Sequence, residues 1–172
     1  ALAKLAQTSA AESARGIMEI DKAKAAIQSA LSQYVQPQFR GNTSADAEVN
    51  TPPPQFNPHF GSHLVCFCQA VVMAARKLAS ATGELVVGVG TSQDDLALAC
   101  QATAQSVKLL LGNSKGGATT SPDRLVRERL LEAAQAAAES SVLLLESCKT
   151  GSKSKTLQAQ AQVTFTFPYL RD

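Results

Sequence analysis

The sequence predicts an all-α protein, an up-and-down four-helix bundle, and two observations carry this prediction. The composition is dense in Ala, Leu, Gln and Ser, lacks tryptophan and has only 5% aromatic residues, which favours helices that meet through small side chains. Four long stretches repeat apolar residues at steps of three and four, the spacing that gathers them on one helix face. At 172 residues the chain has the length of one domain and can bury a sizeable core.

The helix that organises the predicted bundle is expected from Ser121 to Lys149. Ser121 suits the N-cap, and Pro122 suits the first helical position, where its missing N–H would have had no partner within the helix. A helix with a wide apolar face must be covered in water, either by neighbouring helices or by a partner protein. Opposite a polar stripe of Glu132, Glu139 and Glu146, that face consists of Leu131, Ala134, Ala138, Val142 and Leu145, flanked by Leu130, Ala137, Ser141, Leu144 and Cys148.

The first predicted helix covers residues 1–34, and its second half is the more regular. Polar residues and Gly16 interrupt the first half, so the segment forms either one long helix or two helices with a break near Gly16. A break would raise the number of helices in the bundle from four to five. The apolar stripe of the second half consists of Ile17, Ile20, Ile27, Leu31 and Tyr34.

The second helix is expected to begin with Asn57 as its cap and Pro58 in its first turn. It is the most apolar of the four helices, and glycines from Gly83 onward loosen the pattern at its end. Its expected core residues are Phe60, Leu64, Phe67, Val71, Ala74, Leu78 and Leu85.

The third helix is expected to start after a capping-box pattern formed by Ser92 and Asp95. Gly112 and Asn113 are expected to stop it. Its expected core residues are Leu96, Ala99, Cys100, Thr103, Val107 and Leu110.

The segments outside the helices have different compositions. Residues 35–57 hold four of the seven prolines and predict a Pro-rich crossover loop within a helical bundle that occupies residues 1–149. Residues 150–172 predict a flexible linker followed by a strand-like tail. The reason is a period of two, in which threonines alternate with Val163, Phe165 and Phe167.

Composition and motifs exclude several classes of function. The net charge of +2 argues against nucleic-acid binding, and no apolar run reaches the roughly 18 residues of a membrane span. His59, His63 and Cys66 have a spacing that zinc accepts on a helix but lack a fourth ligand. The ligand pairs of di-iron bundles and any set of catalytic side chains are missing, so we expect no metal, no cofactor and no enzymatic activity.

The four cysteines, Cys66, Cys68, Cys100 and Cys148, all fall in apolar helical patterns. They are therefore expected to be buried, reduced thiols rather than disulfides. Reduced thiols indicate a reducing compartment, most simply the cytoplasm.

Two helical segments resemble helices of the talin rod, a part of an adhesion protein that is built from four- and five-helix bundles. They are LALACQATAQSVKLLLGNSK at 96–115 and LLEAAQAAAESSVLLLESCK at 130–149. Both have Leu near the start, Ala-Cys or Ala-Ala about one turn later, then Leu-Leu and a closing Lys. The likeness extends loosely over residues 60–149, while the Pro-rich segment and the tail have no comparable match.

This resemblance implies a non-enzymatic module that links adhesion receptors to actin, in the cytoplasm and associated with the cytoskeleton or cell junctions. It implies protein partners, namely the head of vinculin or a similar protein and other cytoskeletal adaptors. It also implies that some helices bind vinculin once the bundle opens, under force or by competition. The chain shows no counterpart of the C-terminal actin-binding motif of talin, so actin ranks behind vinculin as an expected partner.

The partner-binding surface is expected on the helix at 121–149. The candidate side chains are Leu131, Ala134, Ala138, Val142, Leu145 and Lys149. An alternative is a constitutive scaffold, in which the folded bundle docks an amphipathic peptide helix in a groove and never opens. A third reading, an enzyme or metalloprotein built in the bundle core, has no motif in its favour.

Overall fold

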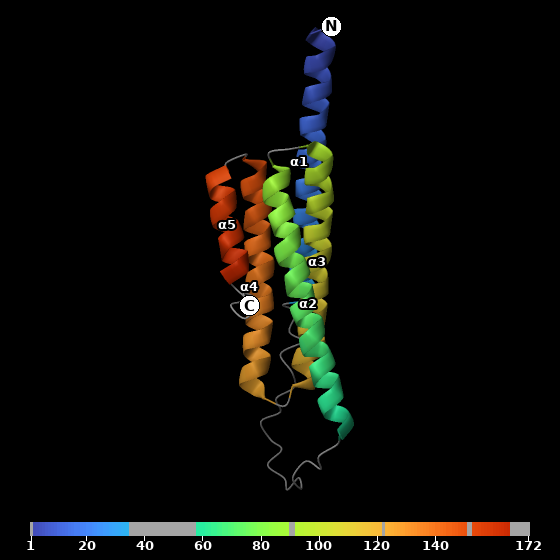
Figure 1. Ribbon diagram of the computed structural model, residues 1–172, viewed down its shortest axis with the longest axis vertical. Helices are drawn as coiled ribbons and strands as arrows, with labels where there is room; N and C mark the ends of the chain where they lie inside the picture. Colours follow the sequence, from blue (N-terminus) through green and yellow to red (C-terminus); the bar gives the residue numbers. More distant parts are fainter. Residues whose placement is uncertain (1, 35–57, 90–91, 122, 151–152, 166–172) are drawn as a thin grey trace.

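A computed structural model of the chain describes residues 2–34, 58–89, 92–121, 123–150 and 153–165. Within these ranges it contains five α-helices and no strand: α1 (Leu2–Tyr34), α2 (Pro58–Gly88), α3 (Gln93–Thr120), α4 (Arg124–Lys149) and α5 (Lys153–Phe165). Successive helices run in opposite directions along one long axis (Figure 1). The prediction of an all-α bundle is confirmed. None of the described helices combines the length and the apolarity needed to cross a membrane.

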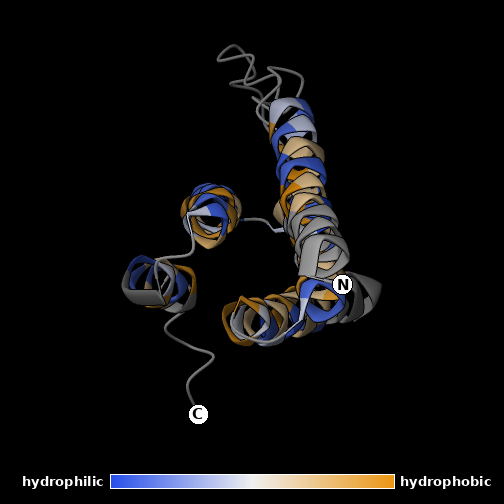
Figure 2. Ribbon diagram, turned by 90° about the horizontal axis from the view of Figure 1, so that it is seen from above, coloured by the Kyte–Doolittle hydropathy of each residue, from blue (hydrophilic) through white to orange (hydrophobic). Residues whose placement is uncertain are grey.

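The helices pack as a closed ring in the order α1, α3, α2, α5 and α4, with α4 returning to α1. Helices α3 and α4 also contact each other across the ring, and α4 reaches α2 as well. As a result, α4 is in contact with each of the other four helices. Figure 2 looks along the bundle and shows that the helices carry apolar and polar residues on different sides.

The core lies inside this ring and uses the predicted apolar stripes. Every expected core residue of α3 is buried, and so are Val71, Ala74, Leu78 and Leu85 of α2. In α1, Ile20, Ile27 and Tyr34 are buried, but Ile17 is 39% exposed, so the predicted stripe begins one turn too early. The side chains of Phe60, Leu64 and Phe67 lie outside the described part of α2.

Helix α1 runs through Gly16 without a break, so the fifth helix does not come from a divided first segment. Gly16 is buried against the start of α3, where an added Cβ would meet Gln93 Oε1 and would lie 3.4 Å from Leu96 Cδ2. These are side-chain atoms, and the Gln93 side chain can move aside, so the contact does not by itself require glycine. A glycine that looks like a helix breaker in the sequence here lies buried within a continuous helix.

Helix α3 does not stop at Gly112 and Asn113, as predicted, but continues to Thr120. Asn113 Nδ2 donates a hydrogen bond to the Ala70 carbonyl of α2 over 3.2 Å, and Ala118 is buried. These tertiary contacts outweigh the low helix propensity of the glycines in this segment.

Because α3 extends so far, the predicted cap of α4 is also wrong. Ser121 is the C-cap of α3, and its N–H donates to the Gly117 carbonyl over 3.0 Å. The N-cap of α4 is Asp123, whose Oδ1 accepts hydrogen bonds from the N–H groups of Leu125 at 2.8 Å and Val126 at 3.4 Å. Pro122 lies outside the described residues.

Two other predicted helix starts are closer to the structure. Ser92 Oγ accepts from the Asp95 N–H at 3.1 Å and donates to Asp95 Oδ2 at 2.7 Å, which confirms the cap of α3. Helix α2 begins at Pro58, as predicted. The Asn57 cap and the crossover loop at 35–57 lie outside the described residues.

The strand-like tail is wrong as far as the described residues test it. Residues up to Phe165 belong to α5, and that helix already includes Lys153 and Lys155 of the predicted flexible linker. Its buried side chains are Thr156, Ala159 and Val163, at steps of three and four, and they face the neighbours α4 and α2. The alternation continues into Thr166 and Phe167, which lie outside the described residues.

Candidate partner-binding site

The candidate surface is the predicted apolar face of α4, and the bundle covers most of it. Ala134, Ala138 and Leu145 have no solvent exposure. Leu131 and Val142 are half-buried against the same core. Five of the six candidate side chains therefore share one covered face, while Lys149 is exposed at its end.

The flanking positions widen this face as the sequence predicted. Ala137, Ser141 and Leu144 are fully buried and Cys148 nearly so, whereas the glutamate stripe of α4 is exposed. The helix thus has one buried, largely apolar face and one solvent-exposed polar face, which is the arrangement that the three-four spacing indicated.

Hydroxyl groups interrupt the apolar interior around α4. Ser141 Oγ donates to the Ala137 carbonyl at 2.8 Å, and Thr103 Oγ1 on α3 donates to the Ala99 carbonyl at 2.8 Å. Both hydroxyls are satisfied one turn back on their own helix. They occupy core positions without contributing the apolar area that a Leu or Val would bury there.

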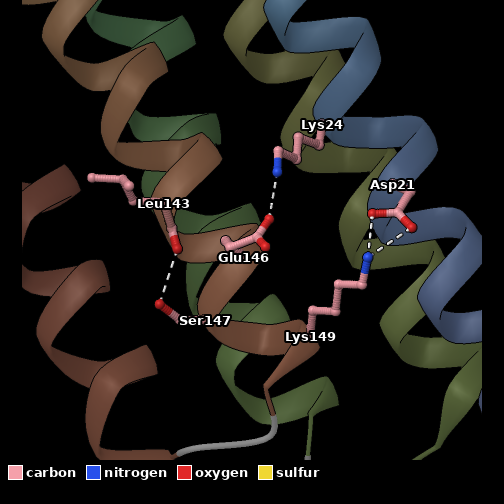
Figure 3. A network of polar contacts seen from close by, with 6 residues as sticks. All are labelled: Asp21, Lys24, Leu143, Glu146, Ser147 and Lys149. Atoms are coloured by element: carbon pink, nitrogen blue, oxygen red, sulfur yellow. Dashed lines mark hydrogen bonds and ion pairs between the residues drawn. The ribbon is translucent and has the colours of Figure 1, made fainter.

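One contact that the sequence did not predict joins α1 to α4. Lys149 Nζ lies 2.9 Å from Asp21 Oδ1 and 3.0 Å from Asp21 Oδ2, and Lys24 Nζ pairs with Glu146 Oε2 (Figure 3). We call these four residues the α1–α4 seam. The hydrogen bond with Asp21 raises the pKa of Lys149 above its ordinary value. Lys149 is therefore already occupied while the bundle is closed.

The spacing of charged residues in the sequence could have indicated the α1–α4 seam, but only if the relative positions of the two helices had been known. Asp21 and Lys24 are three residues apart on α1, and Glu146 and Lys149 are three apart on α4, with the acid before the base in both pairs. Three-residue spacing places each pair on one helix face. Because α1 and α4 are antiparallel neighbours, acid meets base at both positions.

Tyr34 makes a second contact between the same two helices. Its hydroxyl donates to the Leu131 carbonyl over 3.4 Å, close to the start of α4. Burial raises the pKa of Tyr34 well above its ordinary range. Helix α1 therefore holds α4 at both ends, through Tyr34 at one and the α1–α4 seam at the other.

The cysteine prediction is right for two of the three described thiols. Cys100 and Cys148 are free and buried, and burial raises the pKa of each to about 12. Cys68 is free but exposed, so its expected burial is wrong. The side chain of Cys66 lies outside the described part of α2, as do those of His59 and His63. Among the described side chains, no group of His, Cys, Asp and Glu is arranged to hold a metal ion.

Comparison with known proteins gives one relative to report. The chain is 28% identical over 148 residues to talin-B of Dictyostelium discoideum, a match that covers 86% of this chain. The chain spans only 5% of the length of that protein. No protein-family profile and no solved structure matches. The chain is thus an all-helical domain similar to one short part of talin-B.

Proposed function

We propose that this chain is a non-enzymatic adaptor module of the adhesion cytoskeleton, and that α4 is a partner-binding helix which the closed bundle hides. The observation that carries the proposal is the complete burial of Ala134, Ala138 and Leu145 on a helix in contact with all four others. The similarity to talin-B supports a place at the cytoskeleton or at cell junctions.

The physical basis is competition for one set of side chains. The residues that a partner would grip are the residues that hold the bundle together, so the partner and the bundle exclude each other. A domain stable by about 5–15 kcal/mol opens spontaneously in about one molecule in several thousand or fewer. Tension shifts this balance because separating the helices lengthens the chain, and a partner that binds only the open form adds a mass-action term.

The interior of the bundle keeps the cost of opening moderate. Thr103, Ser106 and Ser141 are buried where larger apolar side chains would add stability. Opening also requires α1 to leave α4, which breaks the α1–α4 seam and frees Lys149. When α4 also separates from α2, α3 and α5, its six candidate residues become available together to a partner, for which we propose the head of vinculin or a similar protein.

The direct test compares a synthetic peptide of residues 121–149 with the full chain for binding to the vinculin head. We expect the peptide, which includes the Asp123 cap, to bind far more tightly than the folded chain. In a control peptide, Ala138→Glu and Leu145→Glu place charges on the apolar face and should abolish binding. Equal affinities of peptide and full chain would count against hiding, and a failure of both to bind would remove vinculin as the partner.

A second test opens the bundle without touching α4. Ile27 on α1 has no solvent exposure, so Ile27→Ala should weaken the closed state and tighten binding of the full chain to the vinculin head. The matched control is Met18→Ala on the same helix, at a position that is 69% exposed. Binding that is unchanged in Ile27→Ala, in a protein shown to be less stable, would contradict the proposal.

A further inference from the structure

A groove of about 850 Å³ lies between α2, α3 and α5, on a part of the surface to which α4 contributes no residue. Large apolar side chains line it from all three helices: Val86 and Val87 on α2, Leu98 on α3 and Leu157 on α5. Val87, Leu98 and Leu157 are 64%, 66% and 56% exposed, so they form an apolar surface that the closed bundle leaves open.

The groove exists because the facing side chains of α2 are small. Ala79, Ser80 and Gly83 line it beside the larger residues, one turn apart along the helix. A Cβ added at Gly83 would lie 3.6 Å from Gln160 Nε2 of α5, an ordinary contact distance. A methyl group at Gly83 would therefore fit without a clash, and no backbone atom of α5 lies within 4 Å of it.

Both charged residues that line the groove are acidic. Glu84 and Asp95 line it, and no Lys or Arg is among its lining residues. Ser80 Oγ donates to Glu84 Oε1 over 3.3 Å, which holds that carboxylate beside the groove. The C-terminal end of the α2 dipole adds a partial negative charge, whereas the positive start of α3 is offset by its own Asp94 and Asp95.

We propose that this groove docks a short amphipathic helix from a partner protein, with Leu-like anchors on its apolar face and Lys or Arg beside them. The apolar lining removes the anchors from water, and Glu84 and Asp95 select basic flanks and disfavour acidic ones. The partner binds the closed bundle, so this site works without any opening of α4. The sequence left open a constitutive scaffold as an alternative. This groove would be the docking site of such a scaffold, and its acidic residues would favour basic peptides.

The probes are designed helical peptides of about 18 residues, long enough to be helical when bound. In one set, Leu recurs at steps of three and four in several registers and Lys fills the polar positions. The second set is identical except that Glu replaces Lys. Binding of fluorescently labelled peptides to the full chain is followed by anisotropy, in buffer and at increasing urea. We expect Lys peptides to bind the folded chain, Glu peptides to fail, and Lys-peptide affinity to be lost as the chain unfolds.

Variants at the groove locate the binding. Leu98→Ser and Leu157→Ser should each weaken Lys-peptide binding by about tenfold or more, because each removes a side chain that the peptide would bury. Their matched controls are Leu109→Ser on α3 and Leu143→Ser on α4, which are 49% and 56% exposed but do not line the groove. Glu84→Gln should weaken binding and lower its salt dependence, while Glu132→Gln on α4 should do neither.

Several results would overturn the proposal. They are equal binding of the Lys and Glu sets, no binding by any peptide register, and affinity that both groove variants leave unchanged. Affinity that rises as urea opens the bundle would assign the peptide to a core helix face instead. Concentration-dependent self-association that Leu98→Ser abolishes and Leu109→Ser does not would assign the groove to a second copy of this chain. None of these results bears on the vinculin-head tests, which address α4 alone.

Discussion

Lys149 at the end of α4 holds both carboxylate oxygens of Asp21 on α1, at 2.9 Å and 3.0 Å. The contact places the charged member of the candidate binding face in an ion pair with α1, the helix whose departure the proposed opening requires. Lys24 and Glu146 repeat the arrangement one turn away, with the charges exchanged. The helix α1 thus closes over α4 with apolar contacts inside and two ion pairs at the edge.

Asp21→Asn should make the α1–α4 seam easier to open, by a small factor. The pair is partly exposed, and exposed pairs contribute little because water and salt screen them. We expect a maleimide to label the buried Cys148 thiol faster in Asp21→Asn than in the unchanged chain, with a rate increase of less than about fivefold. Salt at about 1 M should remove the difference, because it shortens the screening length to about 3 Å. Glu139→Gln, which alters only a contact within α4, is the control.

The two buried thiols make the stability of the closed bundle fall at alkaline pH. Burial raises the pKa of Cys100 and Cys148 from 9.0 to about 12, and for Cys100 the negative charges of ionised Cys148 and Glu19 add to the effect. A raised folded pKa means that the folded state holds its proton more tightly than the unfolded state. The stabilisation is therefore complete below about pH 9 and is lost as pH rises toward the folded pKa.

The measurement is the urea midpoint between about pH 8 and pH 9.5, a range below the ordinary pKa of Tyr and Lys. It should decline across this range in the unchanged chain and decline less in Cys100→Ala. Cys68→Ala changes an exposed thiol and should leave the slope as it was. A slope that Cys100→Ala does not alter would show that this thiol does not change its protonation on unfolding.

Leu145→Ala should destabilise the fold by about 2–5 kcal/mol, because it removes a large side chain from a fully packed position. Leu145 has no solvent exposure, whereas Leu143, two residues earlier on the same helix, is 56% exposed. Leu143→Ala is therefore the matched control and should change the unfolding free energy by about 0.5 kcal/mol or less. Equal effects of the two changes, measured by urea denaturation, would contradict the orientation of α4 in which Leu145 is buried and Leu143 is exposed.

The sequence predicts the helix faces well and the helix ends poorly, and the same physics accounts for both. The predicted stripe of α3 runs from Leu96 to Leu110 over about four turns, so several positions indicate the same face. An end depends on one or two residues, and Asn113 bonding to Ala70 on another helix is enough to move it. Such a contact is visible only once the neighbouring helix is in place.

The predicted strand at the C-terminal end was wrong because it rested on a pattern of only a few residues. The alternation at Val163 and Phe165 satisfies a period of two over a few residues. The steps from Thr156 to Ala159 to Val163 satisfy the helical period over a longer range, but two of these residues are small or polar and do not stand out as core. The candidate face of α4 was predictable because its apolar residues are numerous and keep the helical spacing from Leu131 to Leu145. The groove at Leu98 and Leu157 was not, because it joins three helices and depends on how they pack.

The N-cap of α4 is Ser121 according to the sequence prediction and Asp123 in the structure, and substitutions can distinguish the two. Asp123→Ala should cost about 0.5–2 kcal/mol, since Asp123 Oδ1 accepts from two N–H groups of the first turn. Ser121→Ala should cost less, because the Ser121 hydroxyl makes only a 3.4 Å contact to the Asp123 carbonyl. The comparison uses thermal or urea unfolding of both variants. The reverse order of costs would restore Ser121 as the cap.

Two helical glycines should respond in opposite directions to the same substitution. A Cβ at Gly88 would lie 3.2 Å from the Leu96 Cα and backbone N, so Gly88→Ala forces α2 away from the start of α3. Overpacking against backbone costs about 1–3 kcal/mol, more than the gain of up to about 1 kcal/mol in helix propensity. A Cβ at Gly112 would meet nothing within 4 Å, so Gly112→Ala should stabilise α3 by about 0.5–1 kcal/mol. Urea midpoints measure both, and destabilisation by Gly112→Ala would contradict the continuous α3 on which the position of α4 depends.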